Sequence, residues 1–246
     1  MVATGQAVAT GEASSAELTT REGHEMCDFH HHDHSLPPLA ADEYVLDTPF
    51  LRGFIADVRA RIAAADSAGD ACEAIEPLFT GLIADSEWLP ETYQRDAPQS
   101  GMGGGIGQWL LYRAADRSLC LFSLVVPPGS MTPVHDHLAW GLIGLYRGNQ
   151  DEEFYRPSAG GLELLRQRPL EPGDLYRLLP PRDDVHRVRT TSEVTSVSIH
   201  LLASDTGCIL RHTYEETTGA ATPFRSGYVN AECEGPLLTP ALADCD

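Results

Sequence analysis

The stretch "GSMTPVHDHLAWGLIGLYRG" (Gly129–Gly148) places two histidines, His135 and His137, one residue apart in a β-rich run with glycines at both ends. If this run is a β-strand, residues i and i+2 point to the same face. Two imidazoles then project into one space, which is a metal-ligand arrangement when a third ligand joins them. The third ligand has to come from another part of the chain.

The composition limits the kinds of partner that the chain can bind. The 246 residues carry a formal net charge of −19, with 36 acidic and 17 basic residues. This balance argues against nucleic acid as the main partner, because phosphate binding needs a basic surface. No apolar run reaches the roughly 18 residues of a transmembrane helix. The N-terminus has no basic segment followed by an apolar one, so we expect no signal peptide and a cytoplasmic protein that does not bind membranes.

The cysteines give no sign of a disulfide framework or a zinc site. No pair has the CxxC spacing, so in a cytoplasmic chain we expect reduced thiols. The six are Cys27, Cys72, Cys120, Cys208, Cys233 and Cys245.

The chain divides by composition into four parts. Residues 1–40 predict a disordered tail whose "HHHDH" run (His30–His34) is either a solvated polar segment or a loose metal site. Residues 41–95 predict a helical segment with two apolar stripes, the second beginning at a capping pair of Asp70 and Glu73. Pro77 is expected to kink the second helix or to mark its start. Residues 96–230 predict a β-domain, and 231–246 a C-terminal tail.

The β-domain is indicated by eight short segments rich in β-branched, aromatic and leucine residues, separated by turn signals such as "PPGS" and "EPGD". This pattern is typical of a barrel or a sandwich. The segments are "QWLLYR", "SLCLFSLVV", "WGLIGLY", "EEFYR", "LELLRQ", "DLYRLL", "VHRVRT" and "VTSVSIHLL".

Three later histidines are candidates for the third ligand. His186 opens a predicted strand after a proline-rich turn, His200 lies in "SVSIHLL", and His212 lies in "ILRHTY". The context Pro181-x-Asp183-x-x-His186 favours His186. Three neutral imidazoles can hold a divalent first-row metal and leave one face open for substrate and dioxygen.

These motifs resemble those of the cupins. The spacing Gly129-x5-His135-x-His137-x3-Gly141-x6-Gly148 matches the first cupin motif, with Gly141 in the usual place of a glutamate. The His186 segment resembles the second cupin motif, with Asp183 in place of a glycine. A three-histidine cupin that lacks the glutamate resembles the cysteine dioxygenase family of thiol dioxygenases, and "SEWLPETYQ", "LLYR" and "RSGYVN" are similar to its bacterial members. The resemblance covers about residues 42–230 and implies a mainly β fold, a cupin double-stranded β-helix (jelly-roll) barrel preceded by a small N-terminal helical segment.

The resemblance also implies roles for individual residues. His135, His137 and His186 match the ligands of a ferrous ion, with nickel or another divalent metal as alternatives, and dioxygen is the co-substrate. Arg113 matches an arginine that pairs with the substrate carboxylate, and Trp140 is also expected to bind substrate.

Four further positions belong to the relay beside the metal or depart from the family pattern. Ser198 and His200 match the first two members of a catalytic Ser-x-His-x-Tyr relay. Leu202 stands where the relay tyrosine is expected, so it is a substrate-lining candidate that makes the pocket less polar. Gly141 stands where mammalian members carry a cysteine, so no Cys–Tyr crosslink forms between positions 141 and 202.

The implied function is an iron-dependent oxidation of a small thiol, L-cysteine or a mercapto acid such as 3-mercaptopropionate, to a sulfinate. One alternative is a related three-histidine cupin oxygenase with another product, such as a cysteine sulfonamide in natural-product biosynthesis. A second alternative is a metal-binding cupin without enzymatic activity. The sequence does not choose between the thiols, and it does not define the oligomeric state.

Overall fold

The computed structural model describes Met1, residues 36–98 and residues 102–233. The chain divides into residues 1–33 and a compact unit of residues 34–246, and only the second is discussed below. Most of the predicted N-terminal tail, including the "HHHDH" run, lies outside the described residues, as does most of the predicted C-terminal tail.

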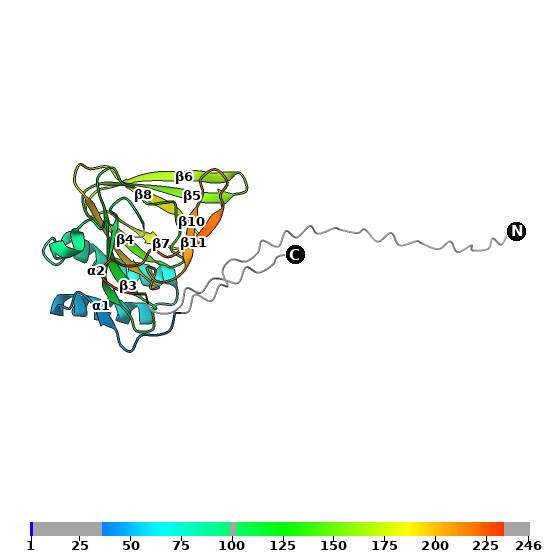
Figure 1. Cartoon of the computed structure of the whole chain (residues 1–246). Helices are drawn as coiled ribbons and strands as arrows, with labels where there is room; N and C mark the ends of the chain where they lie inside the picture. The colour runs from blue at the N-terminus through cyan, green and yellow to red at the C-terminus, as the bar shows by residue number, and fades with distance from the viewer. Residues whose placement is uncertain (2–35, 99–101, 234–246) are drawn as a thin grey trace. The chain divides into compact units, whose positions relative to one another are not determined.

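Two antiparallel sheets form the body of the compact unit (Figure 1). The larger sheet has the strand order β1-β2-β3-β9-β4-β7 and the smaller one β6-β5-β8, while β10 and β11 form a separate hairpin. The strands are β1 Glu43–Tyr44, β2 Gly107–Arg113, β3 Cys120–Val126, β4 Gly141–Arg147, β5 Gln150–Ser158, β6 Gly161–Leu170, β7 Leu175–Leu178, β8 His186–Thr190, β9 Ser196–Leu202, β10 Arg211–Tyr214 and β11 Ala221–Phe224.

Strand β9 shows how the larger sheet separates two apolar clusters. All seven residues of β9 are buried. Val197, Ile199 and Leu201 belong to a cluster shared with the helices. Leu202 belongs to a second cluster, which includes Phe154 of the smaller sheet and therefore lies between the two sheets. Because side chains alternate along a strand, Ser198 and His200 point to the same side as Leu202.

Helices α1 (Pro49–Ala63) and α2 (Ala68–Ala84) cover the outer side of the larger sheet. The Thr48 hydroxyl accepts the Leu51 N–H at 3.1 Å and caps α1. The Ser67 hydroxyl accepts the Asp70 N–H at 3.1 Å and caps α2, so the prediction that Asp70 and Glu73 form the cap is wrong. A short 3-10 helix, η2 (Glu91–Gln94), follows.

Pro77 neither starts nor ends α2, which continues on both sides of it. The residue is exposed, so water can satisfy the carbonyl whose intrahelical donor the proline removes.

The expectation of reduced thiols is wrong for two cysteines. Cys208 and Cys233 form a disulfide with a Cα–Cα distance of 5.1 Å, whereas Cys72 and Cys120 are free and buried. The two bonded cysteines are 25 residues apart, and the chain brings them together through backbone contacts such as the Gly227 N–H to Gly207 carbonyl bond of 2.9 Å. No local spacing in the sequence indicates this pairing.

The mainly β architecture of antiparallel sheets with a small helical part confirms the predicted fold class. The eight predicted strands correspond to β2–β9. None of the helices in the described part of the chain is long and apolar enough to cross a membrane.

Candidate metal centre

The segment carrying His135 and His137 connects β3 to β4 and is not a regular strand, so this part of the strand prediction is wrong. Leu138 has a φ of 54°, in the left-handed region, which interrupts any extended run. His135 instead pairs with His186 across an isolated bridge, each backbone N–H donating to the other's carbonyl at 2.9 Å. This bridge joins the predicted third ligand directly to the first.

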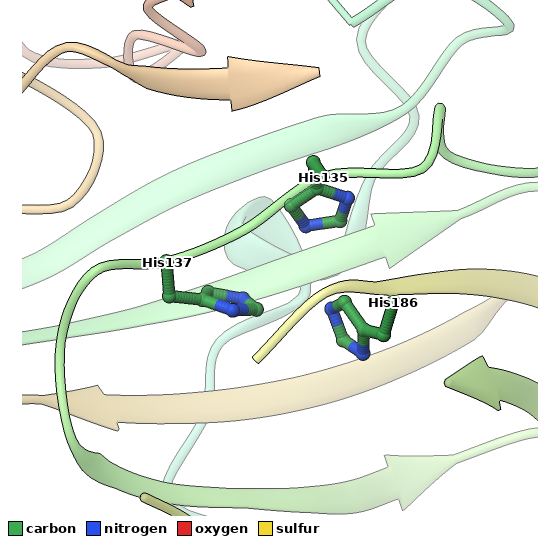
Figure 2. A group of neighbouring side chains, drawn as sticks. All are labelled: His135, His137 and His186. Carbon is green, nitrogen blue, oxygen red and sulfur yellow. The ribbon is translucent and has the colours of Figure 1, made fainter. Parts of the chain in front are cut away.

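The three rings of His135, His137 and His186 converge on one point (Figure 2). Their centroids are 5.1 Å apart for His135 and His137, and His186 lies 4.8 Å from each. One nitrogen from each ring lies within 4.8 Å of the others, and all three residues are buried. The structure therefore brings together the three histidines that the motifs predict as metal ligands.

Each ring has an oxygen acceptor behind it, on the Nδ1 side. The Nδ1 of His135 lies 2.9 Å from the Pro133 carbonyl, that of His137 lies 3.2 Å from Asp184, and that of His186 lies 3.5 Å from the Tyr176 hydroxyl. The Nε2 of His186 is buried and has no hydrogen-bond partner among the described residues. An acceptor at Nδ1 and a free Nε2 form the arrangement found in metal-binding histidines, so the residues fit a divalent metal.

Burial also affects the protonation of two of the rings. Removal from water lowers the pKa of His135 and of His137 well below the usual value, and the neighbouring His186 lowers both further. The imidazoles of His135 and His137 are thus neutral near pH 7 and keep the lone pair that ligation requires.

Two buried aspartates hold the ligand-bearing segment in place. Asp184 accepts the backbone N–H of His137 at 2.8 Å and that of Leu138 at 3.1 Å. Asp136 accepts from the His212 ring at 2.8 Å and from the Tyr214 hydroxyl at 2.9 Å. His212, one of the candidates for third ligand, is therefore hydrogen-bonded to Asp136 and is not part of the three-histidine group.

Gly141 cannot be replaced by the glutamate that cupins usually carry there. A Cβ added at this position would lie 2.1 Å from the Leu201 carbonyl oxygen and 2.9 Å from the Leu202 Cα. Both atoms belong to the backbone of the adjacent strand β9 and cannot move aside. Position 141 therefore cannot supply a fourth ligand in this backbone.

Ser198 and His200 form a pair beside the ligands. The Ser198 hydroxyl lies 3.0 Å from Nε2 of His200, whose ring stacks on Phe122 at 4.6 Å and lies 6.2 Å from that of His137. The Nδ1 of His200 is buried and has no hydrogen-bond partner among residues 36–98 and 102–233, and burial lowers the pKa of this imidazole well below its usual value. Leu202 is fully buried on the same face of β9.

The structure gives Arg113 and Trp140 surroundings that the sequence does not predict. The Arg113 Nε donates to Glu43 at 2.6 Å, and its Nη1 faces Asp205 at 3.4 Å. These partners are acidic groups of the protein itself, so the geometry gives no support to a bond from Arg113 to a substrate carboxylate. Trp140 packs against the apolar cluster on the helix side of the sheet.

Arg211 is a functional candidate that sequence reasoning missed. It is 2% exposed, and its guanidinium donates to the Asp136 carbonyl at 2.6 Å, to the Thr206 carbonyl at 3.2 Å and to the Ser226 hydroxyl at 2.9 Å. No carboxylate lies within ion-pair distance of it among residues 36–98 and 102–233. Burial lowers the pKa of Arg211 to about 10, so it is still a cation near neutral pH.

Gln108 is the second missed residue. It is 3% exposed, its Nε2 has no partner in the described part of the chain, and it lines a cavity of about 380 Å³ together with Ser226 and Tyr228. Ser226 connects this cavity to Arg211. The only sequence signal for Arg211 is its place next to His212, because the contact of β10 with the His135 segment depends on a non-local bridge between Thr213 and His135.

Comparisons with known proteins show a distant likeness. No protein-family model matches the chain. A cupin 2 domain-containing protein from Halorhodospira halophila is 18% identical, with 44% of this chain and 58% of that chain covered and a TM-score of 0.30. The oxalate decarboxylase of Lactobacillus farciminis, in its formate complex, is 13% identical over 37% of this chain and 25% of that chain, with a TM-score of 0.31.

Peruvianin-I, described as a cysteine peptidase from Thevetia peruviana latex, is 19% identical over 48% of this chain and 71% of that chain, with a TM-score of 0.37. The chain thus spans less than two thirds of the cupin 2 protein and of the decarboxylase. At these TM-scores no activity is transferred, and the class of protein follows from the chain's own residues: a β-protein with a buried three-histidine site suited to a divalent metal.

Proposed function

We propose that this protein is a mononuclear non-haem iron thiol dioxygenase that oxidises the sulfur of a small mercapto acid to a sulfinate. The observation that supports this most directly is the set of three buried, converging imidazoles with a steric block against a fourth ligand at Gly141. Such a set leaves a metal with open positions on one face.

In the proposed reaction, a thiol RSH and dioxygen give the sulfinic acid RSO2H. Sulfur loses four electrons, dioxygen gains the same four, and both oxygen atoms end on sulfur. A ferrous ion, when bound, would supply the Lewis acidity that makes the thiol a thiolate and the electrons that activate dioxygen. The described residues orient the substrate, donate or accept hydrogen bonds in the site and exclude water from it.

Three groups of side chains have roles in this proposal. The Ser198 hydroxyl fixes the ring of His200 so that its unpartnered Nδ1 is available to a polar group in the site. Phe122 and Leu202 form the apolar wall beside it and keep water out. Because Leu202 has no hydroxyl group, His200 is the member of this relay that can donate a hydrogen bond to dioxygen in the site.

Arg211 takes the carboxylate-binding role in this proposal, in place of Arg113. It is a buried cation that donates to the backbone carbonyl of Asp136, the residue between two of the metal ligands. Its hydrogen-bond partners are all neutral oxygens. Asp136 and Asp184 interact with it from beyond ion-pair distance, and a substrate carboxylate would supply a direct ionic partner. Gln108, with its free amide nitrogen, is a second donor to the same class of ligand.

A related oxygenase with another product is the second candidate. The observation that favours it is Leu202, because a leucine cannot donate a hydrogen bond to bound oxygen.

We also propose a cytoplasmic location, as the sequence predicts. Disulfides such as Cys208–Cys233 are found mostly in oxidising compartments, so this bond is an exception to the usual pattern in that location.

The test is product analysis of the iron-loaded protein with L-cysteine, 3-mercaptopropionate and cysteamine, together with oxygen consumption. We expect sulfinate from one or both acids and little turnover of cysteamine, which has no carboxylate. A product other than sulfinate would favour the second candidate. No oxygen consumption with any thiol would make the protein a non-enzymatic metal-binding cupin.

Two matched variants assign the carboxylate partner. Losing a charge-assisted hydrogen bond costs roughly 1.5–3 kcal/mol, so Arg211→Gln should raise KM for the acids about ten- to hundredfold. Arg113→Gln should leave KM close to that of the parent, since its partners are Glu43 and Asp205. The reverse result would restore the role to Arg113, and equal turnover of cysteine and cysteamine by the parent would contradict carboxylate recognition altogether.

A further inference from the structure

Glu152 is a buried carboxyl group that the proposed reaction does not use. It lies on β5 and is 0% exposed, and the side chain that faces its carboxyl group is the Tyr176 hydroxyl, at a geometry too poor for a regular hydrogen bond. Burying a polar group without a hydrogen bond costs free energy, and such groups in folded proteins have a reason. The acid therefore calls for an account beyond packing.

Glu152 lies on the Nδ1 side of the metal ligand His186. The Glu152 Oε2 lies 3.7 Å from the His186 Nδ1, and the Tyr176 hydroxyl lies 3.5 Å from the same nitrogen. Strand pairing produces this arrangement, because β5 pairs with β8 and brings Phe154 opposite His186, two residues along from Glu152. Tyr176 comes from β7, in the other sheet, so both sheets contribute an oxygen to one ring nitrogen.

The other two ligands have closer acceptors. His135 has the Pro133 carbonyl at 2.9 Å and His137 has the Asp184 carboxylate at 3.2 Å. Within the described part of the chain, the Nδ1 of His186 has the longer contacts to Tyr176 and Glu152, and its Nε2 has no hydrogen-bond partner. A carboxylate behind a ligating histidine fixes the ring orientation and tautomer and increases the basicity of the ligand.

We propose that Glu152, assisted by Tyr176, is a positioning residue for the metal ligand His186: it accepts the Nδ1–H and directs Nε2 toward the metal. With Asp184 behind His137, two of the three ligands then have a carboxylate behind them. The inference rests on the metal site of the proposed function and not on thiol oxidation.

This role and a purely structural role predict different outcomes for Glu152→Gln, which keeps the shape and removes the acid. If Glu152 positions the ligand, metal affinity falls, because a neutral amide oxygen is a weaker acceptor for the His186 Nδ1–H than a carboxylate oxygen. The melting temperature of the metal-free protein stays the same or rises, because the amide has the size of the carboxyl group and its carbonyl can still accept from the Tyr176 hydroxyl. If Glu152 only supports the fold, melting temperature and affinity fall together.

The experiment uses the full chain and Co(II) as the metal probe, with affinity measured by chelator competition and geometry by the visible absorption of bound Co(II). We expect Glu152→Gln to weaken Co(II) binding about 10- to 100-fold and to shift the absorption bands. Tyr176→Phe should act in the same direction with a smaller effect. Gln150→Ala is the matched control, since Gln150 is equally buried two residues earlier on the same face and bonds Ser196 at 2.9 Å.

The control should lower the melting temperature and leave the Co(II) affinity and spectrum of the folded protein unchanged. Glu152→Gln with parental affinity and spectrum, or with a melting temperature that falls in step with affinity, would overturn the inference. A parent that binds no Co(II) would overturn the metal site and this inference together. A parent that binds Co(II) but oxidises no thiol when loaded with iron would refute the proposed reaction alone.

Discussion

Neighbouring groups give the histidines of this protein opposite properties. His212 donates from Nδ1 to Asp136 at 2.8 Å, and this hydrogen bond raises its pKa above the usual value. Burial among other imidazoles lowers the pKa of His135 and of His137. The sequence context favours His186 over His200 and His212 as third ligand, and the structure agrees, because the ring of His186 joins those of His135 and His137.

The ligand assignment predicts a clear difference between two histidine variants. His186→Ala should lose most of the bound iron and the activity, because two imidazoles remain where three are needed. His212→Gln should keep the iron content of the parent, since that ring faces Asp136. Metal analysis after identical iron loading measures both. Full iron occupancy in His186→Ala would show that the assignment is wrong.

Strand β9 carries core packing on one face and site residues on the other, and its sequence predicts this division. The alternation in "SVSIHLL" indicates that Ser198, His200 and Leu202 share a face, and the two apolar clusters agree with it. Short elements were not predicted: β1, β10 and β11 have only two to four residues and no alternation of their own. The extended segment at His135 was predicted as a strand because its residue pattern does not reveal the left-handed turn at Leu138.

Leu202→Tyr tests the polarity of the site at the level of this strand. Leu202 is fully buried against Gly141, so the larger side chain should overpack the interior and cost about 1–3 kcal/mol of unfolding free energy. Denaturant unfolding measures this cost. In the folded fraction we expect changed turnover or product distribution with a small thiol.

Leu201→Tyr is the control for this variant, because Leu201 is equally buried on the helix side of β9. It should be destabilised without a change of product. A folded, iron-bound Leu202→Tyr protein that matches the parent with every thiol would place position 202 away from the chemistry. The relay roles of Ser198 and His200 would then lose their support.

At the scale of the whole molecule, the site depends on contacts that join distant segments. The sequence predicts the three ligands because they lie in motifs with fixed spacing. It does not predict Arg211, Asp184 or Glu152 as neighbours of the site, because these positions are set by sheet closure and by bridges across the fold. The Cys208–Cys233 disulfide is another contact between distant segments that the sequence does not predict. It joins the loop before β10 to the residues that follow Tyr228 and Val229, which line the cavity.

The disulfide gives a prediction for stability. With its partners 25 residues apart, loop-closure entropy gives a contribution of about 3–4 kcal/mol, which the Cys208→Ser, Cys233→Ser double variant should lose. Denaturant unfolding of the parent with and without reductant should show a difference that the double variant lacks. Equal unfolding midpoints for the parent under both conditions would contradict a disulfide in the folded protein.

The free cysteines provide an internal check on that experiment. Burial raises the pKa of Cys72 to about 11 and that of Cys120 to about 12, so neither forms an appreciable thiolate at pH 8. Alkylation of the native protein at pH 8, followed by peptide mass spectrometry, should therefore leave both thiols unmodified. Rapid labelling of either would show that the core opens around it.

The close approach of β4 and β9 at Gly141 also limits how this protein can evolve. The obstacle to a side chain there is the main chain of Leu201 and Leu202, so no compensating substitution of a neighbouring side chain can make room. A lineage that acquired a glutamate at this position would first have to shift the register of two paired central strands. A fourth protein ligand at position 141 therefore cannot arise by a single mutation while the pairing of β4 and β9 is kept. Single mutations can still change the side chains that line the pocket around the three histidines.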